Sequence, residues 1–224
     1  MAHRLAQGLV GGCALLLGVT VSGCGAPQYT YVANSSQSTY FKVPYGWHQI
    51  GAGALNNIVQ QVMGGVAGWQ VAYEAGPHPS GSDFLAFNAS HPFVFAEVGE
   101  LNSTASQSLS YDTLKDFFLP VSSTAQSNLQ EEYAQDKRTD PFTDFKSIRD
   151  EQLTPGQGVH GVRETFDYTL AGGGPTDTFD EVALTNADQT EVYFLVLHCT
   201  TSCYNSNQAA INDVMTSFTV RSSS

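Results

Sequence analysis

Hydrophobic and polar residues alternate most regularly in the last third of the chain, and this pattern predicts an antiparallel sheet. From Val162 to Leu170, one set of alternating positions is mostly apolar and the other is polar, which is typical of a half-buried strand. Residues 145–153 and 178–185 predict two neighbouring strands. Residues 192–197 are continuously apolar, so we expect this strand to be buried on both faces in the middle of the sheet.

Apolar residues spaced three and four positions apart predict helices that cover this sheet. The stripes lie at residues 55–66, at 111–118 after the cap Ser110, around 129–133, and at 211–218 after the cap Asn205. Shorter strands are predicted at residues 29–32, 40–43, 69–75, 84–88 and 92–98. Together these elements predict an α+β fold, in which an antiparallel β-sheet is flanked by helices on both faces.

The first two dozen residues have the pattern of a secretory signal. Arg4 precedes an apolar run from Leu5 to Val21, and small residues follow before Cys24. The ending Val21-Ser22-Gly23-Cys24 resembles a bacterial lipobox, in which the cysteine becomes the first mature residue and carries lipid. A plain secretory signal and a retained anchor are the alternatives, although the glycine-containing run is short for a spanning helix.

The lipobox sets the predicted domain boundaries. Residues 1–23 form a lipoprotein signal peptide, residues 24–38 are the lipidated Cys24 and a tether, and residues 39–221 form a single domain. Acyl chains such as palmitate on Cys24 would anchor the protein to the cell membrane on its extracytoplasmic side. The mature chain is long enough for one domain with a core and too short to argue for two.

The charge balance restricts the partners. The chain has 21 acidic and 9 basic residues, a formal net charge of −12 and a pI near 4.6. No basic patch is visible, so we expect no nucleic acid partner. The same sign of charge argues against electrostatic docking onto anionic lipid, so the lipid itself must provide the anchor. An acidic surface favours cationic partners, but a solvated surface needs none.

Two cysteines remain once Cys13, in the signal, and the lipidated Cys24 are set aside. Cys199 and Cys203 are four residues apart, and in an oxidising compartment they are expected to form a disulfide. A redox site would favour Cys-x-x-Cys, and a metal site would need more ligands than the adjacent His198 supplies. A structural disulfide is therefore the prediction, with the redox or metal pair as the alternative.

Three segments resemble the PsbP-like superfamily. They are the opening Tyr40-Phe41-Lys42-Val43-Pro44-Tyr45-Gly46-Trp47, the meander from Phe145 to Cys199, and the ending from Cys203-Tyr204 to Ser217-Phe218-Thr219-Val220. The resemblance implies an α/β/α sandwich over residues 29–220, in a family that includes a photosystem extrinsic protein, a Ran-binding import factor and many bacterial lipoproteins. Its members are mostly binding or adaptor proteins without shared catalytic residues, so the resemblance implies a non-enzymatic role without a cofactor.

One loop contains residue types that suit a hydrolase. His78, Ser80 and Asp83 lie close together in the sequence, whereas the members of a serine-hydrolase triad are normally far apart. No Gly-x-Ser-x-Gly elbow is present, and the surrounding glycines and prolines are typical of a plain loop. An envelope hydrolase at this loop is the alternative function.

The other candidate chemistry is weaker. The histidines His48, His91, His160 and His198 show no metal-binding spacing, so no metal site is predicted. The acidic pairs Glu131-Glu132, Asp150-Glu151 and Asp180-Glu181 are adjacent, and neighbours on a strand point to opposite faces, so they predict no acid/base pair. No phosphate-binding or dinucleotide-binding motif is present.

Glu164 is the one irregular position. It lies on the apolar phase of its strand, between Val162 and Phe166, so a covered face would require a partner such as Arg149 or a ligand. A bulge, or a strand that begins only at Thr165, would explain it without a partner.

The sequence therefore favours a membrane-anchored, extracytoplasmic lipoprotein that binds a protein or envelope ligand without catalysis. The residues that could form a binding patch are Trp47, Trp69, Phe93, Tyr111 and Glu164, although packing in the core is an alternative use for the aromatic ones. A purely structural envelope protein is a third hypothesis. The identity of the ligand cannot be read from the sequence.

Overall fold

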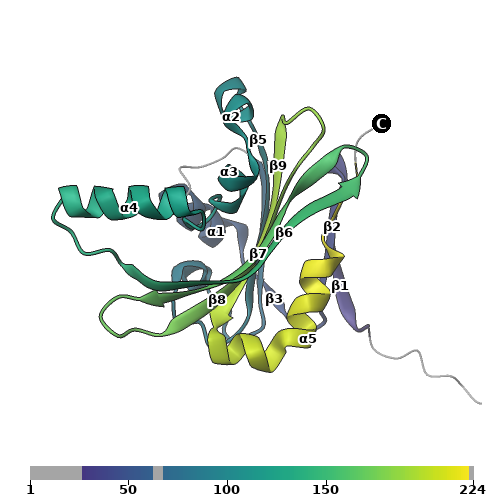
Figure 1. Cartoon of the computed structure of the whole chain (residues 1–224). Helices are drawn as coiled ribbons and strands as arrows, with labels where there is room; N and C mark the ends of the chain where they lie inside the picture. The colour runs from purple at the N-terminus through teal and green to yellow at the C-terminus, as the bar shows by residue number, and fades with distance from the viewer. Residues whose placement is uncertain (1–26, 63–67, 222–224) are drawn as a thin grey trace, which may run out of the picture.

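A sheet of seven antiparallel strands runs through the centre of the molecule, which is known from a computed structural model that describes residues 27–62 and 68–221 (Figure 1). Its strand order is β3-β4-β5-β9-β8-β7-β6. The strands are β3 (His48–Gln49), β4 (Gly68–Glu74), β5 (Phe93–Glu100), β6 (Phe142–Gly156), β7 (Val159–Leu170), β8 (Thr176–Thr185) and β9 (Glu191–Thr200). The continuously apolar strand β9 is the middle one, as its sequence predicts.

A second sheet of three strands packs beside the first. It consists of β1 (Tyr29–Asn34), β2 (Thr39–Pro44) and β10 (Thr219–Val220), in the order β1-β2-β10. Strand β1 pairs with β2 along its whole length and buries Val32, so these residues belong to the folded domain. The predicted tether at residues 24–38 therefore includes β1 and η1, which belong to the domain; the sequence indicated only a short strand at 29–32.

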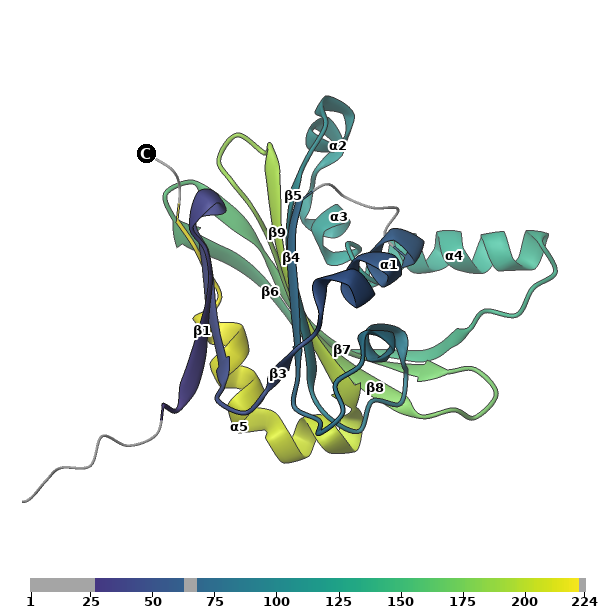
Figure 2. The same ribbon diagram turned by 180° about the vertical axis from the view of Figure 1, so that it is seen from behind.

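Helices cover both faces of the large sheet (Figures 1 and 2). Helix α5 (Thr201–Ser217) lies on the face that also carries the small sheet, while α1 (Ala52–Val62), α3 (Tyr111–Lys115) and α4 (Ser123–Gln135) lie on the opposite side. The remaining elements are α2 (Ser103–Ser108) and the short 3₁₀ turns η1 (Ser35–Gln37) and η2 (Gly81–Leu85). The predicted α+β class, an antiparallel sheet flanked by helices, is confirmed.

The period of the strands creates two cores, one on each face of the large sheet. On the α5 face, residues of α5 and the small sheet, such as Ile211, Val214 and Phe41, pack against alternate positions of β4, β5, β8 and β9. On the other face, Leu114 of α3 and Leu55 of α1 join a group of aromatic side chains that includes Phe166 and Phe179. Successive residues of a strand therefore contribute to different cores.

The alternation of residues 162–170 predicts a half-buried strand, but β7 is buried on both faces over most of its length. The polar residues Arg163, Thr165 and Asp167 are all less than 9% exposed, because α5 covers their face of the sheet. They are accommodated through polar partners on the neighbouring strand β8: Arg163 pairs with Asp180, and Asp167 accepts a hydrogen bond from Thr178. A strand face whose buried polar groups are hydrogen-bonded in this way has the same sequence pattern as a face exposed to solvent.

Two further predictions differ from the structure, and one helix was not predicted. Residues 84–88 do not form a strand; Phe84 lies in η2, where it packs in the core with Phe93 and Phe95. The closing helix begins earlier than the predicted cap Asn205, because Thr200 caps it by accepting from the backbone N–H of Cys203. Helix α2 has no apolar stripe, so its sequence gave no periodic signal.

Several predictions concern residues outside the described ranges. They are the signal peptide at 1–23, the lipidation site Cys24, and the helical positions 63–66. Within residues 27–62 and 68–221, none of the helices has the length and apolar character needed to cross a membrane.

Candidate functional site

The loop proposed for hydrolysis does not assemble a catalytic site. The hydroxyl of Ser80 caps η2 through the backbone N–H of Ser82 and lies 2.7 Å from the Ser82 hydroxyl. The backbone N–H of Ser80 donates to Glu74, which fixes the loop on β4. His78 is exposed and has no hydrogen bond to Ser80 or Asp83 in the described part of the chain. These residues form a capped turn rather than a nucleophile with its base.

The five residues suggested as a binding patch lie in different places. Trp47 and Trp69 pack on the core of the α5 face, whereas Phe93 is fully buried in the core of the opposite face. Tyr111 is half-buried on α3, with its ring edge-to-face with His160. Glu164 is only 1% exposed. The single patch predicted from the sequence is therefore wrong, because the aromatic residues are divided between the two cores.

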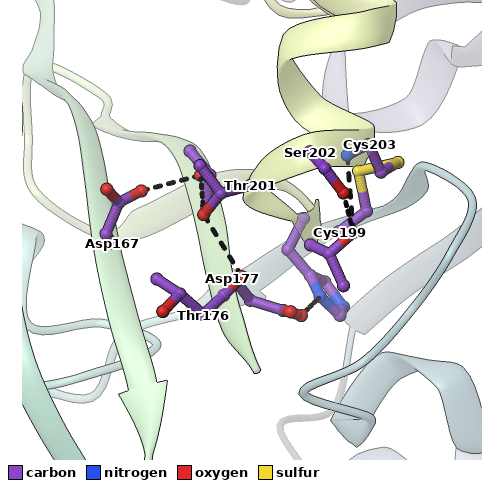
Figure 3. Close-up of polar contacts among 10 residues, drawn as sticks. Asp167, Thr176, Asp177, Cys199, Thr201, Ser202 and Cys203 are labelled. Carbon is purple, nitrogen blue, oxygen red and sulfur yellow. Dashed lines mark hydrogen bonds and ion pairs between the residues drawn. A yellow bond between two sulfur atoms is a disulfide. The ribbon is translucent and has the colours of Figure 1, made fainter. Parts of the chain in front are cut away.

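The disulfide between Cys199 and Cys203 is present and belongs to a junction at the start of α5 (Figure 3). There Thr201 donates to the backbone carbonyl of Thr176, so that the first turn of the helix is fastened to β8. His198 points to the other face of β9, where its ring stacks on Phe179 and contacts the carboxylate of Asp177. The disulfide and the threonine hydrogen bonds fix the helix on the end of the sheet, while His198 packs among residues of the opposite face.

A groove lies on the α5 face of the large sheet. It has a volume of about 590 Å³ and lies where α5 ends and β10 begins, beside the outer strands of the large sheet. Its apolar lining comes from four elements: Leu153 of β6, Val182 and Leu184 of β8, Met215 of α5, and Phe218 and Val220 around β10. The volume falls in the range of small-molecule binding sites.

A buried ion pair forms the polar part of the groove. Arg163 donates from Nε and Nη2 to the two carboxylate oxygens of Asp180, at 2.9 and 2.8 Å. Tyr204 of α5 donates to the same carboxylate at 2.8 Å. Burial by itself would lower the pKa of Arg163, but the hydrogen bonds to Asp180 outweigh it and raise the pKa. The guanidinium therefore stays charged and fixed in the lining of the groove.

A smaller cavity of about 250 Å³ lies on the opposite face, between α3, the start of α4 and the strands β6 and β7. Lys115 of α3 approaches Asp150 at 2.6 Å and Glu164 at 3.7 Å. The partner of Glu164 is therefore Lys115 rather than Arg149, and its strand begins well before Thr165. Glu164 therefore lies on a covered face of the sheet, as the sequence suggested.

The carboxyls around this cavity have different protonation behaviour. Burial, followed by the neighbouring Asp150, raises the pKa of Glu164 to about 8. The hydrogen bond from Lys115 instead lowers the pKa of the more exposed Asp150. Glu181 lies directly opposite Glu164 on β8, and its complete burial holds its pKa well above the ordinary value. Lys115 therefore forms an ion pair with the charged Asp150, whereas the buried carboxyls of Glu164 and Glu181 favour their protonated form.

The described residues contain no group of three or more histidine, cysteine, aspartate or glutamate side chains arranged to hold a metal ion. Sequence reasoning missed the groove because its lining combines residues from β6, β8, α5 and β10, which are distant along the chain. The one available signal was the adjacent pair Asp180-Glu181: Asp180 pairs with Arg163 in the lining of the groove, and Glu181 lies opposite Glu164 at the smaller cavity.

Comparison with known proteins gave matches among solved structures only; no family model and no curated protein matched. The cyanobacterial PsbP (CyanoP) of Synechocystis is 16% identical, with 95% of this chain and 99% of that chain covered and a TM-score of 0.48. LpqN, involved in cell envelope biogenesis of Mycobacterium tuberculosis, is 14% identical over 87% and 91% of the two chains, with a TM-score of 0.46. The Ran-binding protein Mog1p of Saccharomyces cerevisiae is 10% identical over 86% and 95%, with a TM-score of 0.44.

These similarities concern the fold. The solved structures that are similar to this chain include CyanoP, Mog1p and LpqN, each with a TM-score below 0.5. No ligand, partner or activity follows from them.

Proposed function

We propose that this protein is an extracytoplasmic lipoprotein, anchored through Cys24, whose domain binds an apolar envelope ligand in the groove between the large sheet, α5 and β10. The observation that carries the proposal is the groove itself, with its volume of about 590 Å³ and its lining of aliphatic and aromatic side chains. Each methylene group that such a groove removes from water contributes about 0.8 kcal/mol to binding.

The position of Arg163 indicates how a ligand would be oriented. Its guanidinium is held by Asp180 and cannot swing away, so it presents a fixed charge beside an apolar wall. A hydrocarbon chain with a polar carbonyl or acidic end would satisfy both parts of the lining. The proposed ligand class is therefore an acyl-chain molecule of the envelope.

The chemistry of the lining favours binding over catalysis. The titratable side chains that line the groove are Glu151, which is exposed, and the paired Arg163. The hydroxyls in the lining belong to Thr154, Thr216 and Thr219, and the lining contains no histidine to act as their base. A nucleophile needs such a base within hydrogen-bond reach, so we propose a non-enzymatic role.

The groove is tested by titrating the purified soluble domain with a fluorescent fatty acid. Leu153→Trp, on the half-buried wall, should fill the groove and weaken binding at least tenfold. Ile148→Trp is the matched control, because Ile148 is an exposed residue of the same strand and does not line the groove. Equal affinity of both variants and the parent protein, or no binding at all, would contradict the proposal.

The anchor is tested separately in cells that process lipoproteins. Radiolabelled palmitate should be incorporated into the protein, and Cys24→Ala should abolish the label and release the protein from the membrane fraction. Retention of unlabelled Cys24→Ala protein in the membrane fraction would contradict lipidation at this residue.

A further inference from the structure

The outward face of the small sheet is unusually rich in tyrosine. The register pairs Tyr29 with Pro44, Tyr31 with Lys42 and Ala33 with Tyr40, so these six side chains lie on one face, while Val32, Phe41 and Val43 point inward to the core. The outward six are called the tyrosine face below. Tyr31 is 79% exposed, the highest exposure among the large hydrophobic side chains of the described residues.

The second most exposed large hydrophobic residue, Tyr45, lies next to this face in the chain. Tyr45 is 64% exposed and follows β2 directly. Its backbone N–H donates to the carbonyl of Gln28 at 2.9 Å, where the chain enters β1. Gln28 is only four residues after Cys24. Four extended residues span at most about 14 Å, so a lipid on Cys24 would keep Tyr45 and Tyr31 close to the membrane.

The charges of this face differ from those of the rest of the chain. Despite the net charge of −12, the sequence contains no acidic residue before Glu74. Lys42 lies over the ring of Tyr29, and Arg221 lies over the ring of Tyr40, so both cations are on the tyrosine face or at its margin. The carboxylate of Asp213 accepts a hydrogen bond from Tyr29 at the edge of the face. The net charge of the protein therefore does not describe this surface.

We propose that the tyrosine face lies against the headgroup region of the membrane that carries the Cys24 anchor. The inference rests on the proposed lipidation and adds an orientation to it. Tyrosine rings have an apolar body and a polar hydroxyl, which suits the interface between acyl chains and water. Lysine and arginine beside them extend their charges toward anionic headgroups.

This orientation also places the groove near the lipid. Strand β10 pairs with β2 at the edge of the small sheet, and its residues Thr219 and Val220 line the groove. The ligand-binding groove is thus one strand away from the proposed contact surface. An acyl-chain ligand could pass between the bilayer and the groove over a short path.

The test compares hydroxyl-radical oxidation of individual residues by mass spectrometry. Lipidated full-length protein is reconstituted on phosphatidylcholine/phosphatidylglycerol vesicles and compared with lipid-free Cys24→Ser protein in solution. Oxidation of Tyr31 and Tyr45 should fall at least threefold on vesicles, while Ile148 and Tyr133, on the large sheet and α4, should be unchanged.

A matched pair of variants tests the contribution of the side chains. In the lipidated protein on these vesicles, Tyr31→Ser combined with Lys42→Ser should remove most of the protection of Tyr45 from oxidation. Ile148→Ser combined with Lys146→Ser removes an exposed apolar residue and a lysine from β6 and should leave that protection unchanged. Equal loss in both pairs would indicate nonspecific adsorption and overturn the inference.

The outcomes separate the inference from the proposal on which it rests. A vesicle-bound, lipidated protein with unchanged oxidation of Tyr31 would overturn the membrane contact alone. A protein without lipid at Cys24 would overturn both. Protection of Tyr31 by a lipid-free envelope extract would identify a protein as the occupant of this face and would also overturn the membrane contact.

Discussion

Replacing Glu164 by glutamine should make the stability of the protein less dependent on pH. The carboxyl is 1% exposed, and burial followed by Asp150 raises its pKa to about 8, from an ordinary value of 4.5. The folded state therefore keeps a proton that the unfolded chain releases. This stabilisation is fully present below the ordinary pKa and is lost as the pH rises through the folded pKa.

The size of the effect follows from linkage. Where the folded and unfolded states differ by one bound proton, the free energy of unfolding falls by about 1.4 kcal/mol per pH unit. Between about pH 5 and pH 8, one such carboxyl can therefore lower it by up to about 4 kcal/mol. Glutamine cannot ionise, so Glu164→Gln should remove about 2–4 kcal/mol of this loss. The pKa values of Glu97 and Glu181 are also raised, so these carboxyls should keep the remaining decline of stability with pH in the variant.

The assay is urea unfolding, followed by tryptophan fluorescence at several values from about pH 5 to pH 8. The parent protein should be most stable at the acidic end, and the variant should show a shallower decline. Glu131→Gln, on the exposed surface of α4, is the control and should keep the slope of the parent protein. If Glu164→Gln also kept that slope, the buried carboxyl would not be the group that titrates, and the reasoning would be refuted.

Three other substitutions test the packing around the two sites. Arg163→Met leaves the buried carboxylate of Asp180 without its guanidinium partner and should lower the free energy of unfolding by about 3–5 kcal/mol. Adding Asp180→Leu should restore part of the lost stability. An Arg163→Met variant as stable as the parent protein would contradict this account. Cys199→Ser opens the small loop closed with Cys203 and should cost about 2 kcal/mol in urea unfolding, whereas reductant should then leave the variant unaffected. Ser110→Ala removes the capping box of α3 and should cost about 1 kcal/mol; no loss in thermal unfolding would show that α3 is held by its tertiary contacts alone.

The sequence was informative where a structural feature depends on residues that are close together along the chain. The cap Ser110 was predicted because a hydroxyl before a helix satisfies backbone N–H groups within one turn. The pairing of Cys199 with Cys203 was predicted because these two cysteines remain once Cys13 and Cys24 are set aside, in an oxidising compartment. By contrast, the aromatic residues Trp47 and Phe93 could not be assigned to a common surface, because which core each one enters depends on strand pairing across the whole sheet.

The sequence by itself determined most of the strands and most of the helices, because the periods of its apolar residues are local properties. It also determined the central place of β9, since only a strand covered on both faces can be continuously apolar. Tertiary structure alone decided that the polar side of β7 is buried, because this requires α5 to return over it from the far end of the chain. It likewise decided that Lys115 lies beside Glu164 and that β6, β8 and β10 enclose a groove, since these contacts join residues far apart in the sequence.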